Sequence, residues 1–163
     1  ILTSKLLCYM ALCFCSLWTL IFIVRVLRFA NIITFNLAGA SDVGPVVWIE
    51  NASATVTAIQ WIELIGYVVS TAIMIAILFT FILKLLKGLK SDQVFTHGNT
   101  RLLFALAATS FFFELFLMNK HIISGMREIH ITSELFITPT IILLVAMLYS
   151  LAVKAEEENK LTI

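Results

Sequence analysis

Four long runs of apolar residues dominate this chain, and they constrain its fold more than any other feature. They cover approximately residues 6–24, 61–83, 102–118 and 135–153. A membrane-crossing helix needs about 20 predominantly apolar residues, so each run has close to the required length. Charged residues make up only 13% of the chain and hydrophobic residues 61%, which is typical of a membrane protein. The sequence therefore predicts an all-α integral membrane four-helix bundle that forms a single transmembrane domain.

The first apolar run contains all three cysteines, Cys8, Cys13 and Cys15. We interpret this run as a retained span, because it is longer than the apolar part of a typical signal peptide and lacks an Ala-x-Ala cleavage site. A thiol-redox enzyme would need a Cys-x-x-Cys pair at a wet helix end, and the spacing here does not provide one. We expect the cysteines to pack as small hydrophobic side chains.

The distribution of Lys and Arg predicts which connections face the cytoplasm, because short cytoplasmic loops of membrane proteins accumulate positive charge. We expect both termini, the loop 84–101 and the C-terminal tail 154–163 to be cytoplasmic. This orientation places more basic residues inside than outside. The inner ones are Lys5, Lys84, Lys87, Lys90, Arg101, Lys154 and Lys160, and the outer ones are Arg25, Arg28, Lys120 and Arg127.

The first outer loop, residues 31–60, is long and contains neither Lys nor Arg. Most connections in compact proteins have only about 4 to 6 residues, so this loop is expected to fold onto the membrane surface. The sequence from Asp42 to Pro45 indicates a turn. Residues 46–62 mix apolar and polar side chains and could form an interfacial helix or a pair of short strands, of which we favour the helix.

Two carboxylates fall within the predicted spans, and ionisable residues in the membrane are functional candidates by default. Glu63 stands near the outer entrance of the second span, and Glu114 lies in the outer half of the third. Arg25 and Arg28 leave the first span at the same level, and His121 follows Glu114 by about two helical turns. These five residues form the candidate intramembrane polar cluster. Their carboxylates could pair with the basic residues and fix helix packing, could bind an ion, a proton or a ligand, or could reach headgroups or a partner subunit.

Several function classes are not indicated by the sequence. It contains no Gly-rich phosphate loop, Gly-x-Ser-x-Gly elbow or His-Glu-x-x-His motif. His97 is expected inside, whereas His121 and His130 are expected outside, so no convergent metal or haem ligands are predicted. The formal net charge of +1 does not suggest direct nucleic-acid binding. We therefore expect no enzymatic activity, no cofactor and no metal.

The loop 84–101 and the end of the chain carry short motifs that occur together. The loop contains Leu86-Lys87-Gly88, then Val94-Phe95-Thr96, then Asn99-Thr100-Arg101-Leu102, and the tail ends in Leu161-Thr162-Ile163. With four spans and a long first outer loop, these motifs resemble the uncharacterised bacterial membrane proteins grouped as domain of unknown function 2975. The resemblance covers nearly the whole chain. His97-Gly98 departs from the family, in which these positions more often look acidic.

The resemblance implies a bacterial inner-membrane protein without an assigned activity. Members of this family look like frequent genomic neighbours of small helix-turn-helix regulators of the Cro type, which implies a regulatory or sensing partner. The candidate partner surface is cytoplasmic and consists of Phe95, Asn99, Arg101, Leu161, Thr162 and Ile163. A structural alternative explains the same residues by helix capping at Asn99 or Thr100, by topology at Arg101 and by a solvated tail.

Two functions remain open from the sequence. The first is a non-enzymatic four-span protein of the bacterial inner membrane that contacts the lipid bilayer and a small cytoplasmic regulator. The second is an accessory subunit of a larger membrane complex, or a small transport component, that uses Glu63 and Glu114.

Overall fold

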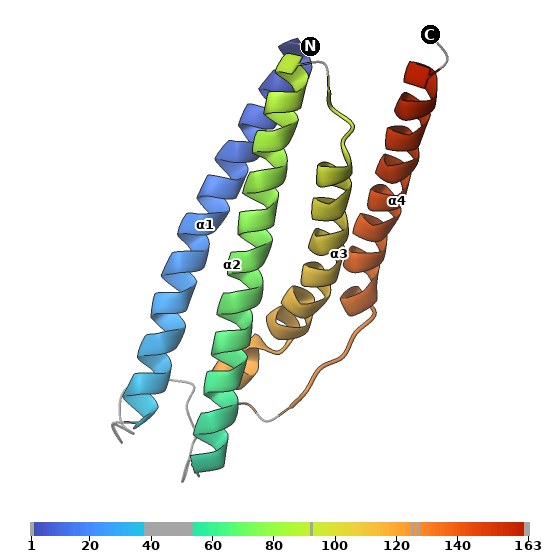
Figure 1. Cartoon of the computed structure of the whole chain (residues 1–163). Helices are drawn as coiled ribbons and strands as arrows, with labels where there is room; N and C mark the ends of the chain where they lie inside the picture. The colour runs from blue at the N-terminus through green and yellow to red at the C-terminus, as the bar shows by residue number, and fades with distance from the viewer. Residues whose placement is uncertain (1, 38–53, 92, 125, 127, 162–163) are drawn as a thin grey trace.

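The computed structural model of this chain is all-helical over the residues that it describes, with no strand among them (Figure 1). These residues are 2–37, 54–91, 93–124, 126 and 128–161. Within them, four helices are long and apolar enough to cross a membrane. The predicted all-α class, with four helices long and apolar enough to cross a membrane, is confirmed. The expected outer-loop turn from Asp42 to Pro45 lies outside the described residues, and so do residues 46–53 of the expected interfacial segment 46–62. Residues 54–62 of that segment are helical and form the beginning of α2 (Ala54–Ser91).

The helices follow one another along the chain as α1 (Leu2–Leu37), α2 (Ala54–Ser91), α3 (His97–Met118) and α4 (Glu134–Leu161), with a short 3-10 helix, η1 (Lys120–Ser124), after α3. At 1.5 Å per residue, the 36 residues of α1 and the 38 of α2 extend about 54 and 57 Å, well beyond the roughly 30 Å hydrocarbon layer. The helices therefore continue past the apolar runs that predicted them.

The four helices form an antiparallel row in chain order (Figure 1). α1 packs against α2, α2 against α3, and α3 against α4, while the described parts of α1 and α4 do not contact each other. The beginning of α1 and the ends of α2 and α4 lie at one end of the molecule, together with the connection to α3. We call this the loop end, and we call the opposite end, which contains η1, the η1 end.

Aromatic rings on three helices meet around Tyr67 in the middle of this row. Tyr67 is buried in α2, and its ring lies 5.9 Å from that of Phe22 and 6.1 Å from that of Phe29, both in α1. On its other side it stacks against Phe113 of α3 at 6.5 Å, and Phe113 contacts Trp18 of α1 edge to face at 5.8 Å. These contacts join the first three helices through packed aromatic rings.

Several hydroxyl side chains within the helices are satisfied locally. Each of these donates a hydrogen bond to a backbone carbonyl one turn earlier in its own helix, which avoids an unpaired donor in the hydrocarbon. The residues with this arrangement include Ser16, Thr19, Thr71, Thr80 and Thr109. Their polarity therefore does not by itself mark a ligand site.

Gly88 allows the chain to fold back at the loop end. The Gln93 amide donates to the Gly88 carbonyl at 3.0 Å, and a Cβ atom at Gly88 would lie 2.6 Å from the Gln93 carbonyl oxygen. A side chain at this position would therefore collide with backbone. The sequence places Gly88 where a helix often ends, but α2 continues to Ser91. The role of this glycine is therefore to let the backbone of Gln93 pack closely against α2.

Candidate functional site

The loop end begins with a capped helix. Thr96 is the N-cap of α3, with an extended backbone (φ −135°, ψ 147°), and its side chain accepts a hydrogen bond from the Asn99 amide at 3.3 Å. Its carbonyl also accepts bonds from the amides of Asn99 and Thr100. Thr, Ser, Asp and Asn are favoured at this position because they satisfy free amides of the first turn. The cap is therefore Thr96, and not Asn99 or Thr100 as the structural alternative supposed.

A polar network then fastens the loop to α3 and α4. The side-chain amide of Asn99 donates to the Val94 carbonyl at 3.2 Å and to the Tyr149 hydroxyl at 3.1 Å, and that hydroxyl donates to the Val94 carbonyl at 2.5 Å. Asn99 is only 1% exposed. It holds the loop end together instead of presenting its side chain to a partner, which corrects its place on the expected partner surface.

Phe95 is the member of the expected partner surface that the structure both exposes and anchors. Its side chain is 43% exposed, and its ring lies 5.1 Å from that of Tyr149 in α4. Tyr149 in turn meets Phe81 of α2 edge to face at 6.3 Å. A large apolar ring is thus held in place outside the apolar runs. Arg101 is also exposed, in the second turn of α3.

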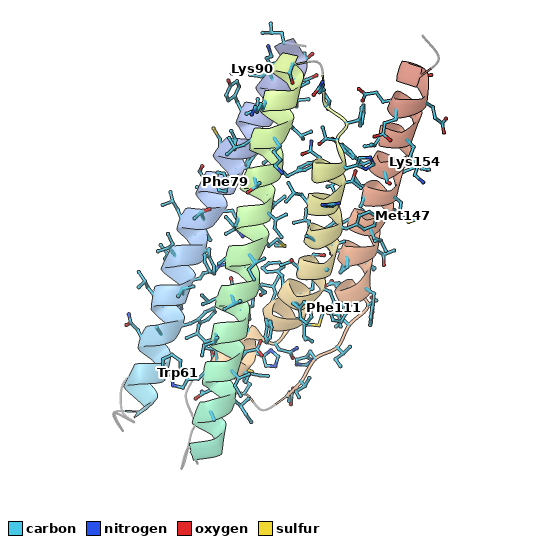
Figure 2. The ribbon with its side chains drawn as sticks, viewed as in Figure 1. Trp61, Phe79, Lys90, Phe111, Met147 and Lys154 are labelled. Carbon is cyan, nitrogen blue, oxygen red and sulfur yellow. The ribbon has the colours of Figure 1, made fainter. Side chains whose placement is uncertain are left out.

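Charged side chains surround this end of the molecule. His97, the first residue of α3, lies 2.9 Å from Glu157 near the end of α4, and both side chains are largely exposed. Lys90 and Lys154 lie toward the loop end (Figure 2). Leu161 is the last residue of α4, while its side chain, Thr162 and Ile163 lie outside the described part of the chain. The structure thus does not bear on the contribution of the tail to the partner surface.

The η1 end contains the second group of polar residues, centred on Glu63. Glu63 belongs to α2 and is 8% exposed, and its Oε1 atom is buried with no hydrogen-bond partner among the described residues. His121 belongs to η1, which packs against the same part of α2. The structure thus places Glu63 and His121, two members of the expected polar cluster, at the same end of the molecule.

The other members of that cluster are arranged differently. Glu114 is half-buried in α3, whereas Arg25 and Arg28 are exposed on α1. Within the described residues, none of the three takes part in an ion pair. His121 does not continue the face of Glu114, because α3 ends at Met118 and the chain turns at Asn119 (φ −98°, ψ 10°) into η1.

Two polar residues at the η1 end escaped prediction. Asn119 donates to the carbonyls of Leu115 at 2.9 Å and His130 at 3.2 Å, and it accepts from the His130 amide at 2.8 Å. Gln60 is 2% exposed and donates to the carbonyl of Ile123 at 3.2 Å. The sequence signals these residues only as amide side chains near the ends of apolar runs. It does not reveal their partners, because Ile123 is distant from Gln60 in the chain and His130 follows a turn after Asn119.

These contacts hold η1 against the sides of the first two helices. Ile123 is fully buried and packs with Leu64, and partly buried Phe29 and Trp61 lie against them. His121 lies beside His130 with ring centroids 4.7 Å apart. The described residues contain no group of three or more His, Cys, Asp or Glu side chains that could hold a metal ion. The η1 end is thus a packed polar junction with one unsatisfied carboxylate oxygen.

An apolar groove of about 390 Å³ lies between α2 and α3. Gly66, Ser70, Phe112 and Phe116 are among the residues that line it, together with Thr109. The Ser70 and Thr109 hydroxyls donate within their own helices, which leaves no free polar group to orient a ligand. A groove of this kind at membrane depth suits apolar chains without selecting among them.

Comparison with protein-family models, with curated proteins and with solved structures found no match for this chain.

Proposed function

We propose that this chain is a non-enzymatic four-span protein of a bacterial inner membrane, and that its loop end docks a cytoplasmic partner such as a small helix-turn-helix regulator. The bacterial setting and the kind of partner come from the resemblance to domain of unknown function 2975. The structure contributes the composition and shape of the surface that such a partner would meet.

The charge of the two ends supports a cytoplasmic loop end. Lys84, Lys87, Lys90, Arg101 and Lys154 are all exposed, and all belong to the last turns of α2, the first turns of α3 or the last turns of α4. Basic residues next to membrane spans are enriched on the cytoplasmic side. A soluble regulator would therefore have direct access to the residues at this end.

Phe95 carries the proposal. Aromatic and Arg side chains are enriched in protein interfaces, and Phe95 presents such a ring outside the apolar runs. The network of Asn99, Tyr149 and Val94 holds the adjacent backbone, so little conformational freedom would be lost on binding. The revised partner surface is therefore Phe95, Arg101 and the tail 161–163, without Asn99.

A pull-down in mild detergent tests this surface. The tagged full chain is recovered from bacterial membranes with its cytosol added back, and bound proteins are identified by mass spectrometry. Phe95→Ala and Arg101→Gln are each expected to lose at least tenfold of the recovered partner, as is deletion of residues 161–163. Phe104→Ala is the matched control, because Phe104 is 40% exposed but lies in the middle of α3. Equal losses in Phe95→Ala and Phe104→Ala would contradict the proposal.

The alternative function is an accessory subunit of a membrane complex, or a small transport component, that acts through the η1 end. The observation that favours it is the buried, unpartnered Oε1 atom of Glu63. Under this alternative, Glu63→Gln or Glu114→Gln removes transport or assembly, whereas deletion of the tail has no effect. The same pull-down therefore separates the two functions, since Glu114→Gln leaves partner recovery intact under the first.

A further inference from the structure

The apolar groove between α2 and α3 is continued toward the loop end by an exposed face of α3. Ala108 and Phe112 line the groove. Ala105 and Arg101 precede them in the chain, and each residue of this series stands three or four positions from the next, so all four share one side of the helix. All four are exposed. This face therefore leads from the groove to a basic residue.

α2, which runs antiparallel to α3 and packs against it (Figure 1), presents a matching face. Ile73 lines the groove, and Ala76, Thr80 and Lys84 follow toward the loop end, again three or four positions apart and again exposed. The Thr80 hydroxyl donates within its own helix, so this face also leads to a basic residue. We call the two series together the α2–α3 face, which consists of Ile73, Ala76, Thr80, Ala105, Ala108 and Phe112.

Lys84 and Arg101 come together at the end of the α2–α3 face. The Lys84 ammonium lies beside α3, because a Cβ atom at Gly98 would be 3.6 Å from Lys84 Nζ. Gly98 precedes Arg101 by three residues and so shares its side of the helix. Neither Lys84 nor Arg101 forms an ion pair with another residue in the described part of the chain. An anion at this point would therefore meet positive charges from two neighbouring helices.

The two cations stand at the depth of lipid phosphates. Lys84 directly follows the apolar run 61–83, and Arg101 directly precedes the run 102–118. From Arg101 to Phe112 the helix rises about 16 Å, which is close to half of the roughly 30 Å hydrocarbon layer. One leaflet of acyl chains fills that half. A lipid whose phosphate contacts the two cations would thus extend its chain along the α2–α3 face as far as the groove.

We propose that the α2–α3 face binds an anionic phospholipid, with the phosphate between Lys84 and Arg101 and one acyl chain in the groove. Basic pockets between membrane helices are known to bind such headgroups. The groove does not select among apolar chains, so selectivity comes from the charge of the headgroup. A zwitterionic headgroup binds less tightly, because its own ammonium group faces the same two cations. The site is independent of the docking function proposed above.

Native mass spectrometry of the purified full chain in mild detergent tests this proposal. The chain is titrated with phosphatidylglycerol and, separately, with phosphatidylcholine that has the same acyl chains. One phosphatidylglycerol molecule is expected to bind about tenfold more tightly than phosphatidylcholine. Equimolar inorganic phosphate should not displace it, because free phosphate has no chain to occupy the groove.

Variants at the two parts of the site should have different effects. Lys84→Gln and Arg101→Gln are each expected to lower the affinity for phosphatidylglycerol about fivefold, as for the loss of one basic residue near anionic headgroups. Both should leave phosphatidylcholine binding unchanged, which also shows that they fold. Ala108→Phe fills the groove and should weaken the binding of both lipids. Lys120→Gln and Ala58→Phe are the matched controls, because both positions are exposed at the η1 end.

Several results would overturn the proposal. Equal affinities for the two lipids would do so, as would full affinity for phosphatidylglycerol in both Lys84→Gln and Arg101→Gln. Displacement by inorganic phosphate would reduce the site to two surface charges. A lipid-free dimer that Ala108→Phe separates would assign the α2–α3 face to a second copy of the chain. Lys84→Gln should leave partner recovery in the pull-down intact, so the failure of one proposal leaves the other standing.

Discussion

Tyr149 shows how much one side chain can contribute in a protein with few polar contacts. Its hydroxyl donates to the carbonyl of Val94 and accepts from the side chain of Asn99, and its ring contacts both Phe95 and Phe81. A single residue of α4 therefore contacts α2, α3 and the segment between them. No other residue of α4 in the described part of the chain contacts α2 through an aromatic pair.

Removing only the Tyr149 hydroxyl is expected to weaken this junction. Tyr149→Phe keeps the ring contacts but leaves Asn99 with one acceptor fewer, and it should lower the free energy of unfolding by about 1 kcal/mol. Denaturation in mixed micelles measures this. Thr80→Val is the matched control, because the Thr80 hydroxyl is exposed and bonds only within its own helix. A double variant with Asn99→Ala should be less destabilised than the sum of the two changes, since both remove the same bond.

Gly66 provides a steric test of the contact between α2 and α3. A Cβ atom at Gly66 would overlap the ring of Phe116, so Gly66→Ala should lower the free energy of unfolding by about 1 to 3 kcal/mol. Adding Phe116→Leu should recover part of this loss. Gly98→Ala is the control, because a Cβ there meets nothing closer than Lys84 Nζ at 3.6 Å. Equal losses for the two glycine variants would contradict the steric explanation.

At the scale of single residues, the sequence could select the positions but not their surroundings. Phe95 and Asn99 lie in neighbouring motifs of the loop 84–101, yet Phe95 is exposed and Asn99 is buried. The difference depends on Tyr149, which lies far away in the sequence and reaches the loop only once α4 is in place. Glu63 was identified correctly as a carboxylate within a span, because an ionisable residue in an apolar run stands out without knowledge of its partners.

At the scale of elements, the apolar runs predict how many helices there are but not where they end. Hydrophobicity reports the depth of a residue in the membrane, whereas helix ends depend on backbone hydrogen bonds and caps. α2 runs through Lys84, Lys87 and Lys90 to Ser91, since lysine is a good helix former. Residues 84–91 of the predicted loop 84–101 are therefore helical. The short helix η1 lay beyond the predicted third span and had no signal of its own.

Asn119 is the residue that makes η1 possible. It connects the last turn of α3 to His130 through both its donor and its acceptor, which fixes the segment that carries η1. Asn119→Ala should therefore speed amide hydrogen exchange in η1 and in residues 128–133, with little change in α4. Thr109→Ala is a suitable control, because its hydroxyl bonds only to Ala105. Uniformly faster exchange across all four helices would indicate general unfolding instead.

At the scale of the whole molecule, the antiparallel row gives the two ends different chemistry. The loop end is rich in exposed lysines, while the η1 end buries a carboxylate and packs a short helix against α1 and α2. The edge helices α1 and α4 expose many large apolar side chains, which lipid must cover. Because the two ends differ in this way, the orientation of the chain in the membrane decides which kind of surface faces the cytoplasm.

Cysteine labelling of intact cells tests that orientation. In a background where Cys8, Cys13 and Cys15 are changed to Ala, a reagent that cannot cross the membrane should label Ile129→Cys but not Lys87→Cys. Both positions are exposed in the structure, so access differs only by the side of the membrane. After the cells are opened, both should be labelled. Labelling of Lys87→Cys in intact cells would place the loop end outside and remove the proposed docking surface from any cytoplasmic partner.

The order of the helices in the row also bears on how the protein is made. Each of α2, α3 and α4 packs against the helix immediately before it in the chain, so it can dock as soon as it leaves the ribosome and enters the bilayer. No helix has to wait for a distant segment to be synthesised, and assembly built from such local contacts is fast and exposes few competing surfaces. Only the Tyr149 junction closes late, when the final helix arrives and secures a hairpin that is already in place.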